Sequence, residues 1–150
     1  MSTVDSIDEA LVKLLGQDAQ QNSETLAKQL NISAATVRRR LKKLIQNDLL
    51  RIVGVVDPKN FGYPLVALVT FDISQDKLTS TLEKLSKRPE IRWISTCTGR
   101  FDIVAIANFR SVDSLSDFNA KYLTQLEGIK DSETFICLDV KKGNYVAQGI

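Results

Sequence analysis

The spacing of the hydrophobic residues changes near residue 51, and this change divides the 150-residue chain into two parts. Before it, apolar side chains recur at the three- and four-residue intervals of amphipathic helices. After it, β-branched and aromatic residues form short runs that alternate with helical segments. We therefore predict a domain over 1–50, a hinge strand and linker over 51–62, and a second domain over 63–150.

The first domain is predicted to contain three short helices. Asp5 or Ser6 can cap the first helix. Asn22 can cap the second and Ser33 the third, because their side-chain oxygens accept hydrogen bonds from free amides of the first turn. Asn31 suits a left-handed turn between the second and third helices. This arrangement is a helix-turn-helix.

The second domain is predicted to follow the order βαββαβ. Its expected strands are 65–73, 91–98, 101–109 and 132–140, and its expected helices are 76–88 and 111–128. This order is typical of the ferredoxin-like fold, in which the strands lie side by side in the order 4-1-3-2. The fold class is therefore α+β: an N-terminal helix-turn-helix domain and a C-terminal ferredoxin-like βαββαβ domain.

The central strands of this sheet are apolar on both faces. The two predicted helices can cover only one face. On the other face, Val66 and Leu68 of the first strand and Val104 and Ile106 of the third need another partner to be buried. Simple partial exposure is one explanation, and a second subunit laid sheet against sheet is the other. We favour a dimer, because exposed apolar patches usually mark interfaces.

Positive charge is concentrated in one segment. Residues 33–51 contain six basic side chains and one acidic side chain, although the net charge of the whole chain is only +2. Alone, such a face is more often the solvated side of an amphipathic helix. However, no acidic residue lies between Arg38 and Lys43 to form stabilising i,i+4 pairs. The segment is also the second helix of a helix-turn-helix, which enters the major groove of DNA.

We therefore predict that the third helix binds double-stranded DNA. The candidate DNA-binding residues are Ser33, Ala35, Thr36, Arg38, Arg39, Arg40, Lys42 and Lys43. Arg40 flanks the expected core stripe, so pairing with Asp5 or Asp8 is its alternative role. That stripe consists of Val37, Leu41, Leu44 and Ile45.

The side-chain inventory disfavours several functions. There is no histidine, which is the commonest general base and metal ligand, so we expect no enzyme activity, metal or cofactor. There is no signal peptide and no apolar run long enough to span a membrane, which predicts a cytoplasmic protein. Cys97 and Cys137 are expected to be buried and reduced, on opposite edges of the sheet and too far apart to form a disulfide.

Three stretches together resemble the Lrp/AsnC (feast/famine) transcription regulators: LAKQLNISAATVRRRLKKL, VVDPKNFGYPLVALVTFDI and TGRFDIVAIANF. The resemblance implies a DNA-binding regulator modulated by a small molecule, commonly an amino acid. It also implies dimers formed through the sheet, which often assemble into octamers. The chain departs from the family at Asp48, where glycine is frequent, and at Gln20, where a basic residue is frequent.

The resemblance places the effector at the turn formed by Thr98, Gly99, Arg100, Phe101 and Asp102. Gly99 permits close approach of a ligand to the backbone. Asp102 can receive an α-ammonium group, and backbone amides can hold an α-carboxylate. The alternative is a plain two-residue β-turn, with Asp102 solvated. A tetrapyrrole decarboxylase of the same fold is a competing function, disfavoured because that chemistry is expected to use histidine.

Overall fold

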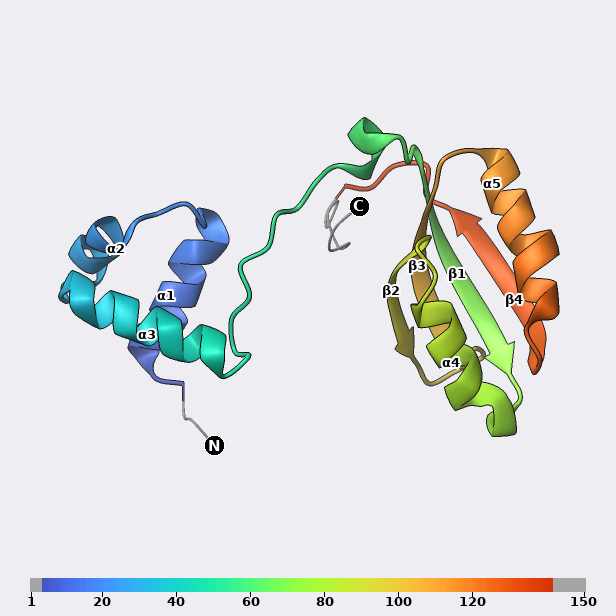
Figure 1. Ribbon diagram of the computed structural model, residues 1–150, viewed down its shortest axis with the longest axis horizontal. Coiled ribbons are helices and arrows are strands. Elements are labelled where there is room, and N and C mark those ends of the chain that lie inside the picture. The colour runs from blue at the N-terminus through green and yellow to red at the C-terminus, as the bar shows by residue number, and fades with distance from the viewer. Residues whose placement is uncertain (1–3, 142–150) are drawn as a thin grey trace. The chain divides into compact units, whose positions relative to one another are not determined.

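The computed structural model describes residues 4–141, which form two compact units divided between Val53 and Gly54 (Figure 1). This division lies inside the predicted linker. The hinge strand predicted over 51–57 is absent, and Asp57 instead caps a 3₁₀ helix, Pro58–Phe61. A strand needs a neighbouring backbone, and none among the described residues pairs with this segment.

The N-terminal unit contains the three predicted helices, α1 (Ser6–Gln17), α2 (Ser23–Leu30) and α3 (Ala34–Gln46). Asp5, Asn22 and Ser33 cap them through their side chains, as predicted. Asn31 ends α2 in the left-handed conformation, with φ of 53°. The structure therefore confirms the helix-turn-helix and the chemistry that begins each of its helices.

Apolar side chains from all three helices form the core of this unit. Leu11 and Leu15 of α1 pack with Leu26 of α2 and Val37 of α3. The expectation that Ile45 is buried is wrong, since its side chain is 47% exposed. Ile45 is turned by roughly 80° from Val37 around the helix, which puts it at the margin of the stripe rather than at its centre.

An ion-pair cluster joins α3 to the start of α1. One Arg40 nitrogen, Nη1, donates to Asp5 at 2.7 Å and to the buried Asp8 at 2.9 Å. Asp5 and Asp8 also form the capping box of α1, each accepting from the other's backbone amide. The alternative role considered for Arg40 is thus confirmed: it ties α3 to the start of α1.

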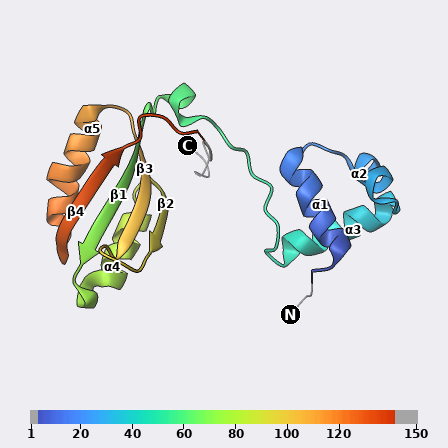
Figure 2. The same ribbon diagram turned by 180° about the vertical axis from the view of Figure 1, so that it is seen from behind.

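The C-terminal unit is a four-stranded antiparallel sheet whose strands are β1 (Leu65–Ile73), β2 (Ile91–Thr96), β3 (Ile103–Phe109) and β4 (Ile129–Ile136). The strands lie in the order β2-β3-β1-β4, which confirms the ferredoxin-like topology. Its helices are α4 (Leu78–Ser86) and α5 (Val112–Asp117). In Figure 2 the strands lie in front of α4, so that view shows the sheet face that α4 does not cover.

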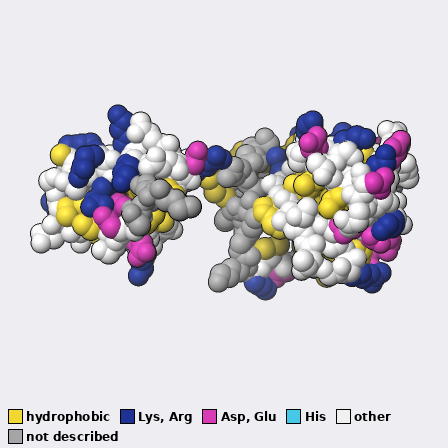
Figure 3. All heavy atoms as spheres, turned by 90° about the horizontal axis from the view of Figure 1, so that it is seen from below, with side chains coloured by type: hydrophobic (Ala, Val, Ile, Leu, Met, Phe, Trp, Pro, Cys, Tyr) yellow, Lys and Arg dark blue, Asp and Glu magenta, His cyan; other side chains and the backbone are white. Residues whose placement is uncertain are grey.

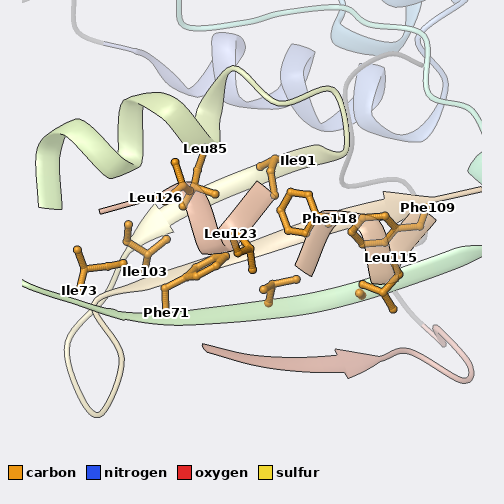
Figure 4. Close-up of a cluster of buried hydrophobic side chains, with 14 residues drawn as sticks. Phe71, Ile73, Leu85, Ile91, Ile103, Phe109, Leu115, Phe118, Leu123 and Leu126 are labelled. Atoms are coloured by element: carbon orange, nitrogen blue, oxygen red, sulfur yellow. The ribbon is translucent and has the colours of Figure 1, made fainter. Parts of the chain in front are cut away.

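One continuous core lies between this sheet and its helices (Figure 4). Phe71 of β1 and Ile103 of β3 pack with Leu85 of α4 and with Leu115 and Phe118 from the second helical segment. Both helical segments therefore cover the same face, as the sequence predicted. Val66, Leu68, Val104 and Ile106 alternate with the core positions along β1 and β3 and are only half-buried.

The last strand and the helix before it differ from the prediction. The helix expected over 111–128 is α5 followed by a π-helical turn, Phe118–Tyr122, and a 3₁₀ turn, Leu123–Gln125. Gly128 then turns the chain directly into β4 with φ of 90°, so β4 begins at Ile129 rather than 132. It ends at Ile136, and the Cys137 amide just beyond it still donates to the Val66 carbonyl of β1 at 2.8 Å.

Both cysteines are free and exposed, so the expectation that they are buried is wrong. Cys97 lies one residue beyond the end of β2, and Cys137 one residue beyond the end of β4. These strands occupy opposite edges of the sheet, as predicted. They also run in opposite directions, which places the two thiols at opposite ends of the sheet.

We predict that the Asp5–Arg40 contact makes the stability of the N-terminal unit depend on acid pH. The Asp8 amide and the Arg40 guanidinium lower the pKa of Asp5 below its ordinary value of 3.8. This stabilisation is complete above that value and is lost as the pH falls through the lower, folded-state pKa. Asp5→Asn keeps a capping side chain but loses the charge, so it should melt several degrees below the wild type at pH 7.

Thermal melts followed by circular dichroism from pH 2 to pH 7 test this expectation. The difference between Asp5→Asn and the wild type should shrink as the pH falls below 3.8. Asp18→Asn is a matched control, because Asp18 caps the opposite end of α1 and has no ion pair with Arg40. Equal melting temperatures at pH 7, or a difference that does not change with pH, would contradict this role for the Asp5 charge.

Candidate nucleic-acid interface and effector turn

The first turn of α3 presents small side chains to solvent. Ser33 Oγ accepts from the amide of Thr36 at 3.1 Å and lies 2.8 Å from the Thr36 hydroxyl. Ser33 therefore holds the helix start in place, while Ala35 beside it is exposed. The side chain of Ala35 is only a methyl group, so the backbone of this turn can approach a partner closely.

The basic side chains of α3 divide into two groups. Arg38 pairs with Glu24 of α2 at 3.1 Å, and Arg40 is held by Asp5 and Asp8. Arg39, Lys42 and Lys43 are exposed and form no ion pair among residues 4–141. Figure 3 shows Lys and Arg side chains grouped on the N-terminal unit, with a few carboxylates beside them.

This division has a simple electrostatic consequence. The hydrogen bond to Asp5 and then the one to Asp8 raise the pKa of Arg40, so it stays charged, but two carboxylates offset its charge. Arg39, Lys42 and Lys43 are the candidate residues whose charge remains available to a phosphate backbone. The surface is therefore less basic than the sequence count of 33–51 suggests.

The predicted effector turn connects β2 to β3. The amide of Cys97 donates to the carbonyl of Asp102 at 2.9 Å, which closes a loop of the four residues 98–101. Gly99 lies in this loop with φ of 122°, and the space around its α-carbon is open. The loop is longer than the two-residue β-turn considered as the alternative.

Asp102 is engaged by its own chain rather than simply solvated. Its Oδ2 accepts from the amide of Ile73 at 2.8 Å, and its Oδ1 accepts from Gln75 Nε2 at 3.2 Å. These bonds tie the start of β3 to the end of β1. A carboxylate has about four acceptor positions, so each oxygen keeps capacity for one further donor.

Arg100 pairs with two acidic residues of β4 that were not predicted to lie near this turn. It pairs with Glu133 at 2.9 Å and with Asp131 at 3.7 Å, both on β4. Its guanidinium also stands 5.0 Å from the centre of the Phe101 ring. Local sequence patterns cannot indicate these pairs, because they depend on which residues of β4 lie near the end of β1.

Comparisons with known proteins agree with both units. Residues 4–45 match the AsnC-type helix-turn-helix domain, and residues 66–146 match the Lrp/AsnC ligand binding domain. An uncharacterised HTH-type transcriptional regulator of Pyrococcus furiosus is 31% identical over 95% of this chain and 97% of its own length. The HTH-type transcriptional regulator Ptr1 of Methanocaldococcus jannaschii is 29% identical over 90% of this chain and 92% of its own.

Solved structures show the same fold. Escherichia coli AsnC is 26% identical and superposes with a TM-score of 0.85 over 93% of this chain and 95% of its own. A Neisseria meningitidis transcriptional regulator in complex with L-Met gives a TM-score of 0.87 at 22% identity, with 94% of each chain covered. Among residues 4–141, no helix is long and apolar enough to cross a membrane. The chain therefore belongs to the Lrp/AsnC family of helix-turn-helix transcriptional regulators.

Proposed function

We propose that this regulator binds duplex DNA through the exposed face of α3 and responds to an amino acid at the 98–102 turn. The observation that supports DNA binding most strongly is the exposed Arg39, Lys42 and Lys43 on the second helix of a helix-turn-helix. In such motifs the N-terminal part of this helix meets base edges, and neighbouring basic residues meet phosphates.

The contacts of each side chain suggest separate roles on DNA. Arg39 lies nearer the N-terminus of α3 and suits bidentate recognition of a guanine. Lys42 and Lys43, further along the helix, suit phosphate contacts. Ala35 and Thr36 can contact a thymine methyl group. Arg38 and Arg40 position α3 against α2 and α1 through their ion pairs, with Arg38 the more exposed of the two.

We infer that two copies of the chain associate through the uncovered face of the sheet. This face combines the half-buried Val66, Leu68, Val104 and Ile106 with Trp93, which is 41% exposed, and Phe135, which is 50% exposed. Phe135 lies opposite Leu68, and Trp93 lies opposite Ile106. Contiguous apolar side chains of this size favour burial against a partner. Further assembly to an octamer follows from the family resemblance.

Amino-acid chemistry fits the turn. The Arg100 side chain is 71% exposed, and its guanidinium suits an α-carboxylate. Asp102 keeps acceptor capacity for an α-ammonium group, and Gly99 leaves the backbone accessible. Thr98 and Phe101 flank these residues. The L-Met complex of the Neisseria relative supports an amino acid as the class of effector.

We also infer that the chain acts by binding rather than by catalysis, and in the cytoplasm. The absence of histidine from the sequence supports binding rather than catalysis, because the tetrapyrrole chemistry of related folds is expected to use that residue.

DNA binding should depend steeply on salt and should separate the roles of Arg39 and Lys43. Lys42 and Lys43 on each protomer give a dimer four phosphate contacts, because Arg39 is assigned to a base edge. Log K should then fall against log salt with a slope of about −4. Lys43→Ala should weaken all sequences alike and reduce the magnitude of the slope by about 2, because both protomers of the dimer lose a contact. Arg39→Ala should instead relax preference at one base position, at a cost of about 1–3 kcal/mol.

Fluorescence anisotropy with duplexes from the chain's own upstream region, at several salt concentrations, provides these slopes. Lys13→Ala is a matched control, since it removes an exposed cation from α1, outside the proposed interface. A slope near zero would exclude the phosphate contacts. Identical sequence profiles for Arg39→Ala and Lys43→Ala would contradict the division between base and phosphate contacts.

An amino-acid effector should raise the thermal stability of the full chain. A ligand that binds only the native state adds about 2.7 kcal/mol at 100 times its dissociation constant. We expect a thermal-shift screen of the twenty L-amino acids to identify one or a few stabilising members. Arg100→Gln should reduce their effect at least tenfold in apparent affinity, whereas Lys87→Gln, an equal charge loss after α4, should not. An unchanged response in Arg100→Gln would rule out this turn as the carboxylate site.

The uncovered sheet face should hold the dimer together. Val104→Asp would place an unpaired charge in the proposed interface, where its burial is strongly unfavourable. We expect light scattering to show a monomer or an unfolded chain. Val112→Asp, at a position 64% exposed, makes the same substitution outside this face and should leave the assembly unchanged. A monomeric wild type, or an undisturbed oligomer in Val104→Asp, would refute this interface.

A further inference from the structure

A second polar cluster lies at the other end of the sheet from the effector turn. In Figure 1 the 3₁₀ helix that precedes β1, the end of β3 and the start of α5 come together there, whereas the β2–β3 loop lies at the opposite end. The length of β3, seven residues, separates the two ends by roughly 20 Å. This cluster belongs to neither the DNA-binding surface nor the effector turn.

Two arginines of this cluster share one aromatic ring. Arg110 stands 4.6 Å from the centre of the Tyr63 ring and donates from Nη2 to the Tyr63 hydroxyl at 3.1 Å. Arg92 stands 5.4 Å from the same ring centre. Stacking on a ring holds a guanidinium in a fixed orientation without neutralising its charge.

Neither of these arginines has a carboxylate partner among the described residues. The nearby acids are already engaged: Arg88 holds Glu90 through two hydrogen bonds of 2.8 and 3.1 Å, and Lys121 pairs with Asp117 at 2.8 Å. Arg92 Nε is buried without a hydrogen-bond partner in this part of the chain. Two positive charges therefore remain uncompensated around Tyr63.

A cavity of about 190 Å³ opens beside them. It is lined by Tyr63, Pro89, Glu90, Asn108, Phe109, Arg110 and Ser114. Asn108 is only 3% exposed, and no hydrogen bond between described residues uses its side-chain amide. The Asn108 amide therefore keeps hydrogen-bonding capacity for a ligand in this cavity. Pro89 and Phe109 are the apolar residues of its lining.

We propose that this cavity binds a small organic carboxylate. Arg110 supplies the guanidinium for the oxyanion, Asn108 supplies an amide donor, and Phe109 and Pro89 contact an apolar body. The cavity volume of about 190 Å³ suits a short carboxylate rather than a drug-sized ligand, whose pockets measure roughly 300–1,000 Å³. A purely inorganic anion would leave Phe109 and Pro89 unused. This site is separate from the effector turn and does not depend on it.

Saturation-transfer NMR on the full chain tests this site with 3-methylbutanoate, a carboxylate of seven non-hydrogen atoms. We expect saturable transfer to its methyl protons, and none to 3-methylbutan-1-ol, which has the same body without the charge. Arg110→Gln should weaken binding at least tenfold, and Arg92→Gln should weaken it to a lesser extent. Lys84→Gln removes an exposed charge on α4, away from this cavity, and should have no effect.

Each other outcome would overturn the proposal. Absence of saturable transfer from 3-methylbutanoate would exclude a carboxylate site of this size. Equal binding by the alcohol, or by Arg110→Gln with an unchanged thermal midpoint, would exclude guanidinium recognition. Full displacement by inorganic phosphate at lower concentration than 3-methylbutanoate would identify a simple anion site instead. Loss of binding in Arg100→Gln but not in Arg110→Gln would place the ligand at the effector turn.

Discussion

The C-terminal unit depends on a sheet that has helices on only one face. β1 pairs with β3 on one side and β4 on the other, so its alternate residues either enter the core with Phe71 or lie on the uncovered face with Leu68. An antiparallel sheet with one solvated face usually shows polar residues there. Here that face presents valine, leucine, isoleucine, tryptophan and phenylalanine. The same strands that build the core thus also create the surface that favours a partner.

The basic residues of α3 divide between contacts that hold the helices together and the proposed DNA-binding surface. Arg40 is placed against α1, and its partners Asp5 and Asp8 also cap that helix, so one cluster fixes the helix start and the helix packing. Arg39, one residue earlier, is exposed and forms no ion pair with these acids. Exposed ion pairs add little stability, about 0–1 kcal/mol, which makes Arg38 and Glu24 easy to separate when DNA approaches. Sequence alone counts these arginines equally, whereas their contacts distinguish them.

Local chemistry explains which features could be predicted. The caps Asp5, Asn22 and Ser33 and the left-handed Asn31 follow from interactions within a few residues, and the alternation of β1 follows from its own side chains. The shifted start of β4 could not be predicted in this way, because it depends on how Gly128 packs against Lys77, distant in sequence. The pairs of Arg100 and Asp102 depend likewise on long-range register. The fold was therefore predictable to a greater extent than the detailed contacts of the effector turn.

Those contacts constrain how the turn can respond to a ligand. A ligand shifts a conformational equilibrium only by its difference in affinity for the two states. The bond between Asp102 and the Ile73 amide joins two strands, and breaking it would leave a backbone donor unsatisfied, at a cost of about 1–3 kcal/mol. In the Arg100–Glu133 pair the Arg100 side chain is 71% exposed, so solvent screens the pair and it contributes about 0–1 kcal/mol. At the proposed effector site, a carboxylate that took the place of Glu133 and Asp131 on Arg100 would release β4 from the loop at little cost, while Asp102 would keep the loop attached to β1.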